Sequence, residues 1–246
     1  MKKVLIIFIL LLGSVITSFR INNENVQNVL VVAEPVHFEI QDLEIKNNYI
    51  KNDNTVNTSL EEIGIVTYIN PETNQFAALG HSIFDGDDGM EIKGLCYNIE
   101  FQHSEENSKD ITNVNLNKGE PIGYVYYDNY SGVYGKINNI DEKLYRIVET
   151  ANRYEIKKGK ASILIRLDGN NLESYEVDIV GINYFASNKN IRVKITDERL
   201  ISETGGIVQG MSGTPVMQNG KLVGAINCVN ICNAQDAYGI FIDKII

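Results

Sequence analysis

Residues 215–227 read PVMQNGKLVGAIN, so the dipeptide Asn219-Gly220 separates two apolar runs. Asn-Gly between apolar runs is the strongest short signal for a β-hairpin, because both positions tolerate positive φ. Just upstream, residues 191–195 alternate between isoleucine or valine and a basic residue. That alternation predicts a strand with one buried face.

Short strand-like runs continue toward the N-terminus, and turn residues separate them. They cover residues 29–32, 37–40, 63–69, 75–79, 91–101, 121–127, 144–148, 161–167 and 174–180. The cluster Asn70-Pro71-Glu72-Thr73-Asn74 would join 63–69 and 75–79 into a hairpin. No long amphipathic helix is expected after residue 20. Many short strands with turns between them predict an all-β barrel or sandwich.

The charge balance excludes one class of partner. The net charge is −10 and the pI about 4.9, which repels nucleic acid. The three cysteines, Cys96, Cys228 and Cys232, cannot all pair within one chain, so a disulfide scaffold is not expected. Small, semi-buried thiols are the simpler interpretation. We expect no metal site and no organic cofactor.

The N-terminus has the pattern of an export signal. Lys2-Lys3 precede an apolar run over residues 4–16, and no clear cleavage site follows. We therefore expect a signal peptide or membrane anchor in 1–20, a polar linker with short strands in 21–60, and the main domain in 61–246. The domain would lie outside the cytoplasm, either anchored to the membrane or secreted.

The segment 205–215, GGIVQGMSGTP, contains a serine framed by glycines. Glycine permits a tight turn that exposes the Ser212 Oγ atom and aims backbone N–H groups at one point. The N–H groups of Gly210 and Ser212 could form an oxyanion hole. The alternative interpretation is a tight surface turn without chemistry.

His81 follows the hairpin at 63–79 and is a candidate general base for Ser212. Two aspartates compete to orient it. Asp85 lies only four residues later and would have to curl back toward the ring. Asp197 ends the strand at 191–195, although an aspartate there could also cap a helix. We expect Asp197 to be the third member, which gives the order His, Asp, Ser seen in chymotrypsin-type enzymes.

Two segments resemble the SpoIVB peptidase family. They are Gly64 to Asp85, with Asn70-Pro71 and Ala78-Leu79-Gly80-His81, and Asn188 to Gly239, with Thr204 to Gly213, Gln218 to Lys221, Gly224-Ala225 and Tyr238-Gly239. The resemblance implies a chymotrypsin-like double β-barrel and a serine endopeptidase with His81, Asp197 and Ser212 as catalytic residues. It also implies a membrane-associated regulatory protein as substrate, in sporulation signalling.

Two features depart from the family pattern. Residues 20–60 are too few for the PDZ domain that typical members carry. In place of a Thr-His-Val-like segment, the chain has Asn227-Cys228-Val229-Asn230. A chymotrypsin-like pocket would be lined by Gly206 and Ile207 before the serine and by Ala225 and Asn227 after it. These segments carry no charge, which predicts a small or apolar residue on the acyl side of the scissile bond. The rival hypothesis is a non-catalytic, membrane-tethered binding module on a protease-like fold.

Overall fold

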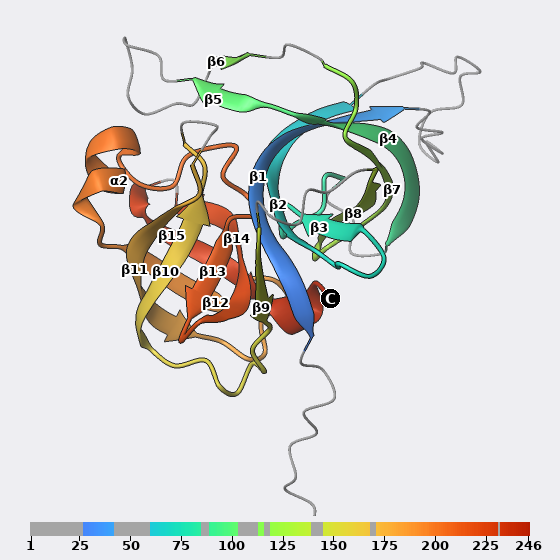
Figure 1. Ribbon diagram of the computed structural model, residues 1–246. Coiled ribbons are helices and arrows are strands. Elements are labelled where there is room, and N and C mark those ends of the chain that lie inside the picture. The colour runs from blue at the N-terminus through green and yellow to red at the C-terminus, as the bar shows by residue number, and fades with distance from the viewer. Residues whose placement is uncertain are drawn as a thin grey trace, which may run out of the picture.

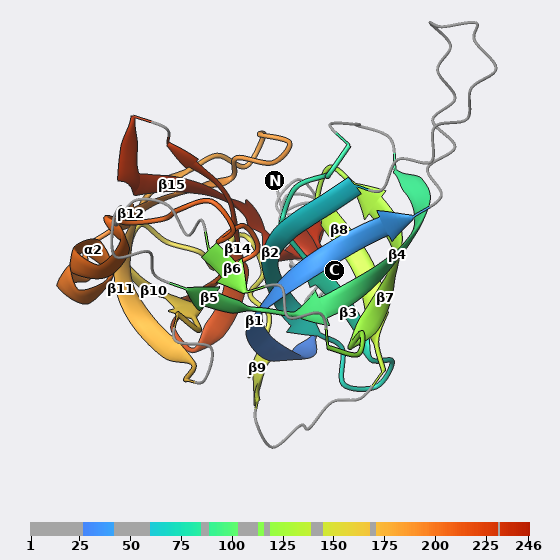
Figure 2. The ribbon, with the colours of Figure 1, turned by 90° about the horizontal axis from the view of Figure 1, so that it is seen from above.

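The computed structural model describes residues 27–41, 60–84, 89–102, 113–115, 119–138, 145–167, 171–230 and 232–246. These residues form two six-stranded antiparallel β-barrels that lie side by side (Figures 1 and 2). The expected signal or anchor in 1–20 lies outside the described residues. Within the described ranges, no helix has the length and hydrophobicity needed to cross a bilayer.

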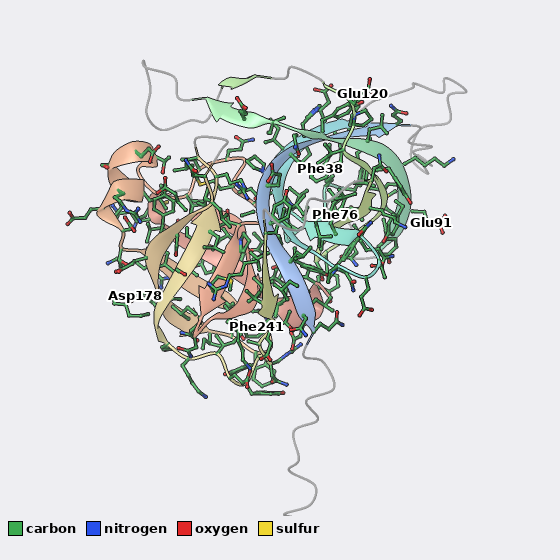
Figure 3. The ribbon with its side chains drawn as sticks, viewed as in Figure 1. Phe38, Phe76, Glu91, Glu120, Asp178 and Phe241 are labelled. Atoms are coloured by element: carbon green, nitrogen blue, oxygen red, sulfur yellow. The ribbon has the colours of Figure 1, made fainter. Side chains whose placement is uncertain are left out.

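The first barrel runs in the order β2-β3-β8-β7-β4-β1 and closes through pairing of β1 with β2. Its strands are β1 (Asn28–Gln41), β2 (Leu60–Ile69), β3 (Gln75–Ala78), β4 (Met90–Asn98), β7 (Gly123–Asn129) and β8 (Gly132–Ile137). Phe38 and Phe76 stack inside it with ring centroids 6.3 Å apart (Figure 3). Burial of such aromatic and aliphatic side chains is the main stabilising contribution to the barrel.

Strand β1 differs from the sequence-based prediction, which had two short strands within a polar linker. It is one strand of 14 residues, with a bulge where Ala33 takes a φ of 48°. Its first residues pair with β9 (Arg146–Glu149), and its later residues pair with β4. The first barrel therefore begins well before residue 61, and β1 connects it to the segment that leads into the second barrel.

The second barrel is closed in the order β10-β11-β12-β15-β14-β13. Its strands are β10 (Gly159–Ile165), β11 (Glu173–Ile182), β12 (Ile191–Ile195), β13 (Pro215–Gln218), β14 (Lys221–Asn230) and β15 (Asn233–Phe241). The predicted hairpin is confirmed: Asn219 and Gly220 have φ values of 53° and 79° between β13 and β14. A short helix, α2 (Glu198–Thr204), follows β12, and a 3-10 helix, η2 (Ile242–Lys244), follows β15.

The predicted chymotrypsin-like double β-barrel is confirmed by this topology. Strands β8 and β15 were missed, because β8 contains two glycines and β15 opens with polar residues, which weakens the strand pattern. Two short strands, β5 (Glu100–Gln102) and β6 (Asn113–Asn115), form a separate ribbon. A third buried cluster, distinct from the two barrel cores, contains Val29, Val31, Leu222, Ala225 and Ile240 from both barrels.

Candidate active site

Ser212 lies in the turn between α2 and β13. The turn requires glycine at 213, where φ is 96°. A Cβ there would lie 2.0 Å from the carbonyl oxygen of Ile65 and 2.7 Å from the amide nitrogen of Leu79. Both atoms belong to the backbone of the first barrel and cannot move aside. Glycine at this position therefore allows the serine turn to lie directly against the first barrel.

Hydrogen bonds hold the serine turn against β2. The carbonyl of Ser212 accepts a bond from the Ile65 N–H at 2.8 Å. The carbonyl of Gly213 accepts one from the fully buried Thr67 hydroxyl at 2.7 Å. The same β2 backbone binds the segment after β3, because the Leu79 N–H donates to the Ile65 carbonyl at 3.3 Å. His81 is two residues beyond Leu79, so one strand positions both the serine and the histidine segments.

The chain makes a sharp turn just before His81. Leu79 and Gly80 both have positive φ, at 67° and 70°. The His81 ring is partly exposed, and its Nδ1 lies 3.0 Å from the Ser82 carbonyl oxygen. A carbonyl can only accept, so this contact assigns the proton to Nδ1 and leaves the lone pair on Nε2.

A buried carboxylate on β7 lies behind the histidine segment. Asp128 is 1% exposed and accepts hydrogen bonds from the Ser82 hydroxyl at 2.5 Å and the Ile83 N–H at 3.1 Å. Burial raises the pKa of Asp128, and these bonds and the charge of His81 act in the opposite direction. The carboxylate therefore fixes the segment that carries His81 and interacts electrostatically with its ring.

Sequence reasoning missed Asp128. The available signal was a carboxylate at the end of the β-rich run Gly123–Asn129, GYVYYDN, in which the preceding residues predict a half-buried strand. An acidic residue that is buried at the end of such a strand needs hydrogen-bond partners, and a buried carboxyl with a perturbed pKa is a candidate for a functional site.

Asp197 is placed elsewhere, which corrects the expectation that it lies beside His81. It is the N-cap of α2 and accepts bonds from the Arg199 N–H at 3.0 Å, the Arg199 guanidinium at 2.8 Å and the Glu176 N–H at 3.1 Å. The Arg199 bonds are the main reason that its pKa falls to about 2. Helix α2 lies at the outer edge of the second barrel, far from β3 (Figure 1). The oxygens of the Asp197 carboxylate are therefore already engaged by the N-terminus of α2 and by Arg199. The alternative, Asp85, lies outside the described residues.

The serine turn leaves two backbone donors available. Within it, the Met211 N–H donates to Val208 and the Gly213 N–H to Ile226. The N–H groups of Gly210 and Ser212 have no acceptor among the described residues. Gly210 has a φ of 91°, a conformation that favours glycine. The two amides named as an oxyanion hole are therefore free to bind an oxygen. In the described part of the chain, no hydrogen bond joins Ser212 Oγ to His81.

The residues expected to contact substrate are mostly buried. Ile207 is 3% exposed in the second barrel core, and Ala225 is fully buried between the barrels. Gly206 has a φ of 135°, and a Cβ there would lie 2.3 Å from the Ala234 carbonyl oxygen. These three residues shape the backbone, and none of them presents an exposed side chain.

Asn227 differs from the other three because it borders the histidine segment. A Cβ on Gly80 would lie 3.2 Å from its Cβ. Its Nδ2 donates to the Asn188 carbonyl, and its buried Oδ1 has no partner among the described residues. Asn227 is therefore the predicted substrate residue that lies nearest to His81.

Metal ligands are not gathered in the parts of the chain that the structure describes: no group of three or more His, Cys, Asp or Glu residues could hold an ion there. Cys96, Cys228 and Cys232 are free thiols, and burial raises the pKa of Cys96 and of Cys228.

Comparison with known proteins gave one family and a set of solved structures. A family model described as SpoIVB peptidase S55 matches residues 51–246. The thermostable serine protease AL20 from an extremophilic microorganism is 9% identical over 85% of this chain and 91% of its own, with a TM-score of 0.46. Protease Anisep from Arthrobacter nicotinovorans is 9% identical over 87% of this chain and 93% of its own, with a TM-score of 0.42. A search of curated proteins found no match.

Proposed function

The chain belongs to the SpoIVB peptidase S55 family and is a serine peptidase, and from this premise we propose that Ser212 is its nucleophile and His81 its general base. The observation that carries the proposal is the attachment of the serine turn to β2. The Ser212 carbonyl binds Ile65, and Ile65 in turn binds the segment that ends at His81. A nucleophile from the second barrel and a base from the first barrel are thereby brought to the contact between the two barrels, as a triad requires.

His81 would take the proton from Ser212 Oγ as that oxygen attacks the carbonyl carbon of a peptide bond. The contact between Nδ1 and the Ser82 carbonyl supports the tautomer in which Nε2 can accept this proton. The protonated ring would then donate to the leaving amine, and the acyl group would remain on Ser212 until water hydrolyses it. Catalytic hydrogen bonds often tighten only in the Michaelis complex, which accounts for the unmade bond between Ser212 Oγ and His81.

Asp128, and not Asp197, is proposed as the carboxylate that stabilises the protonated histidine. It is buried, it fixes Ser82 and Ile83, and its charge interacts with that of His81. Since its partners are the two residues after His81, it acts by positioning that segment and by its negative charge. The chain order His81, Asp128, Ser212 is again that of chymotrypsin-type enzymes.

The oxyanion that forms on the attacked carbonyl would be bound by the N–H groups of Gly210 and Ser212. Both point from a glycine-framed turn and lack another acceptor in the described part of the chain. Preorganised backbone donors of this kind lower the barrier without reorganisation at the moment of reaction, and each contributes about 3 to 4 kcal/mol.

The proposed substrate is a membrane-associated regulatory protein in sporulation signalling, and the proposed location is outside the cytoplasm. Family membership supports the first, and Lys2-Lys3 before an apolar run supports the second. A reporter that is active only outside the cytoplasm, fused to the C-terminus, tests the location. A reporter signal from inside the cytoplasm would contradict it.

Labelling of the purified full chain with a fluorophosphonate tests the enzymatic proposal. The wild-type protein should be labelled at Ser212, and Ser212→Ala should not be labelled while its circular dichroism is unchanged. A folded wild-type protein that resists the reagent would instead indicate a binding module on a protease-like fold.

A further inference from the structure

Three aromatic side chains gather on two loops at one end of the second barrel. They are Tyr154, before β10, and Tyr184 and Phe185, in the turn between β11 and β12; we call them the aromatic tip. Phe185 is 99% exposed, Tyr154 is 58% exposed, and the rings of Tyr154 and Tyr184 stack with centroids 5.6 Å apart. Tyr184 also contacts Phe241, which lies at the lower edge of this barrel in Figure 3. A phenylalanine held fully in water beside two tyrosines is an unusual use of apolar surface.

The turn that carries Phe185 is rigidly built. The Asn183 side chain accepts from the Phe185 N–H at 3.0 Å and from the Ala186 N–H at 3.2 Å. Asn190, which is 1% exposed, donates its side-chain amide to the carbonyls of Asn183 and Ala186. Lys244 donates to the Ala186 carbonyl as well, at 2.6 Å. The backbone is therefore fixed in a shape that keeps Phe185 out of the core.

Lysines surround the aromatic tip, although the chain as a whole carries a net charge of −10. Lys157, Lys158 and Lys189 are exposed, and none of the three has an ion pair with a described residue, although Lys189 Nζ lies 5.3 Å from the centroid of the Tyr238 ring. The acidic neighbour of Tyr154, Glu155, is paired with Lys221. Lys157 Nζ donates to the Tyr154 carbonyl at 3.1 Å, so this charge belongs to the same surface. Exposed aromatic rings with lysines that are not ion-paired around them are the composition of protein surfaces that enter the headgroup region of an anionic membrane.

The described chain begins beside the aromatic tip. The Gln27 N–H donates to the Thr150 hydroxyl at 2.9 Å, and the Thr150 N–H donates to the Gln27 carbonyl at 2.8 Å. Thr150 is four residues before Tyr154. In Figure 1 the start of β1 lies next to β9, at the same end of the molecule. Ten residues, 17–26, separate Gln27 from the apolar run at 4–16. Ten residues span at most about 35 Å, so a membrane that holds the apolar run would be near this end.

We propose that the aromatic tip is a membrane-contacting surface, in which Phe185 enters the interface of an anionic bilayer and the lysines bind lipid headgroups. The same turn contains Asn188, whose carbonyl accepts from Asn227 beside the histidine segment. Contact of the tip with the bilayer therefore sets the height of Ser212 and His81 above the membrane, where a membrane-associated substrate would be cut.

The absence of tryptophan from the sequence allows a direct test. In the full chain, Phe185→Trp places the only tryptophan at the tip, and Tyr124→Trp places it on an exposed position of β7 in the first barrel. Each variant is mixed with vesicles of phosphatidylcholine and phosphatidylglycerol that carry brominated acyl chains. We expect quenching and a blue shift of the emission for Phe185→Trp and neither for Tyr124→Trp. Adding Lys157→Gln, Lys158→Gln and Lys189→Gln to Phe185→Trp should remove most of the quenching.

Both variants keep the same N-terminal segment, so the amount of protein that this segment attaches to the vesicles is the same for both. Nearness of the tip to that attachment is separated from lipid contact by the lysine substitutions, which leave the N-terminal segment unchanged. Equal quenching in the two variants, or quenching in neither, overturns the proposal, and the second result favours a protein partner for the tip. A blue shift of Phe185→Trp without vesicles also overturns it, since residues 4–16 or a second copy would then cover the tip. Because the readout is independent of catalysis, it stands or fails separately from the proposed peptidase mechanism.

Discussion

Asp128 and Asp197 both accept several hydrogen bonds, yet their surroundings shift the pKa of the two carboxyl groups in opposite directions. Asp197 lies at a helix N-terminus with Arg199, and these partners lower its pKa to about 2. Burial raises the pKa of Asp128, and among the described residues His81 is the one basic side chain whose charge acts against that shift. The fold stabilises the negative charge of Asp197 and opposes the negative charge of Asp128. A carboxylate that is buried although burial removes its solvation is the better candidate for a functional role. A carboxylate that is neutralised by an arginine is the better candidate for a structural role.

The largest expected loss of activity is that of Ser212→Ala, and the losses expected at the two aspartates are compared with it. Ser212→Ala should lower the turnover of a peptide substrate by about 10⁶-fold, because the nucleophile of a triad cannot be replaced by another group. The measurement is kcat at saturating substrate, with the free energy of unfolding as the control. Activity near the wild-type level would show that Ser212 is not the nucleophile and that the contact between the serine turn and β2 is not the active site.

The next effect separates the two carboxylates. Asp128→Asn should lower kcat/KM by about 10²- to 10⁴-fold, the range that general acid–base catalysis contributes. Ser82→Ala is the matched control, because it removes a hydrogen bond to Asp128 and keeps the charge. If Ser82→Ala is as damaging as Asp128→Asn, the carboxylate acts through the loop alone.

The raised pKa of Asp128 also has a stability consequence. A carboxyl whose pKa is higher in the folded state contributes most to stability below its ordinary value of 3.8, and that contribution is lost as the pH rises through the folded pKa. The free energy of unfolding of the wild type, relative to Asp128→Asn, should therefore fall as the pH is raised from 3 toward neutrality. A relative stability that rises over this range would contradict the assigned direction.

A smaller effect is expected where the serine turn meets β2. Thr67→Val removes the buried hydroxyl that binds the Gly213 carbonyl, and the unsatisfied carbonyl should cost about 1 to 3 kcal/mol of unfolding free energy. Displacement of the serine should lower kcat/KM by about tenfold to a hundredfold. Thr67→Ser keeps the hydroxyl and should retain most of the activity. Equal activity of Thr67→Val and Thr67→Ser would show that this bond does not position the serine.

The smallest effect on activity is expected at Asp197. Asp197→Asn should leave kcat/KM near the wild-type value, and Asp197→Ala should lower the free energy of unfolding by about 1 kcal/mol through loss of the helix cap. Since the pKa of Asp197 is depressed, the stability that its charge contributes is present above pH 3.8 and is lost as the pH falls toward 2. A loss of activity in folded Asp197→Asn that exceeds the loss in Asp128→Asn would restore Asp197 to the site.

The sequence was sufficient for the local elements and insufficient for the proposed third member of the triad. Asn219-Gly220 and the alternation at 191–195 are local patterns, and both were confirmed. The contact of Asp128 with the histidine segment depends on the pairing of β7 with β4 and β8, which joins residues far apart in the chain. The position at the end of the strand 191–195 favoured Asp197, but the short helix that begins there turns its carboxylate to Arg199. Spacing along the chain does not reveal which strand end meets which loop.

The bonds from β2 to the serine turn also bear on how the protein folds. Thr67 and Gly213 are 146 residues apart in the chain. Contacts between such distant residues require closure of long loops, and folds dominated by them form slowly. A chain that has completed only its first barrel has the histidine without the serine. If Ser212 and His81 act together as proposed, proteolytic activity requires the docking of the two barrels, and its appearance during refolding would report that step.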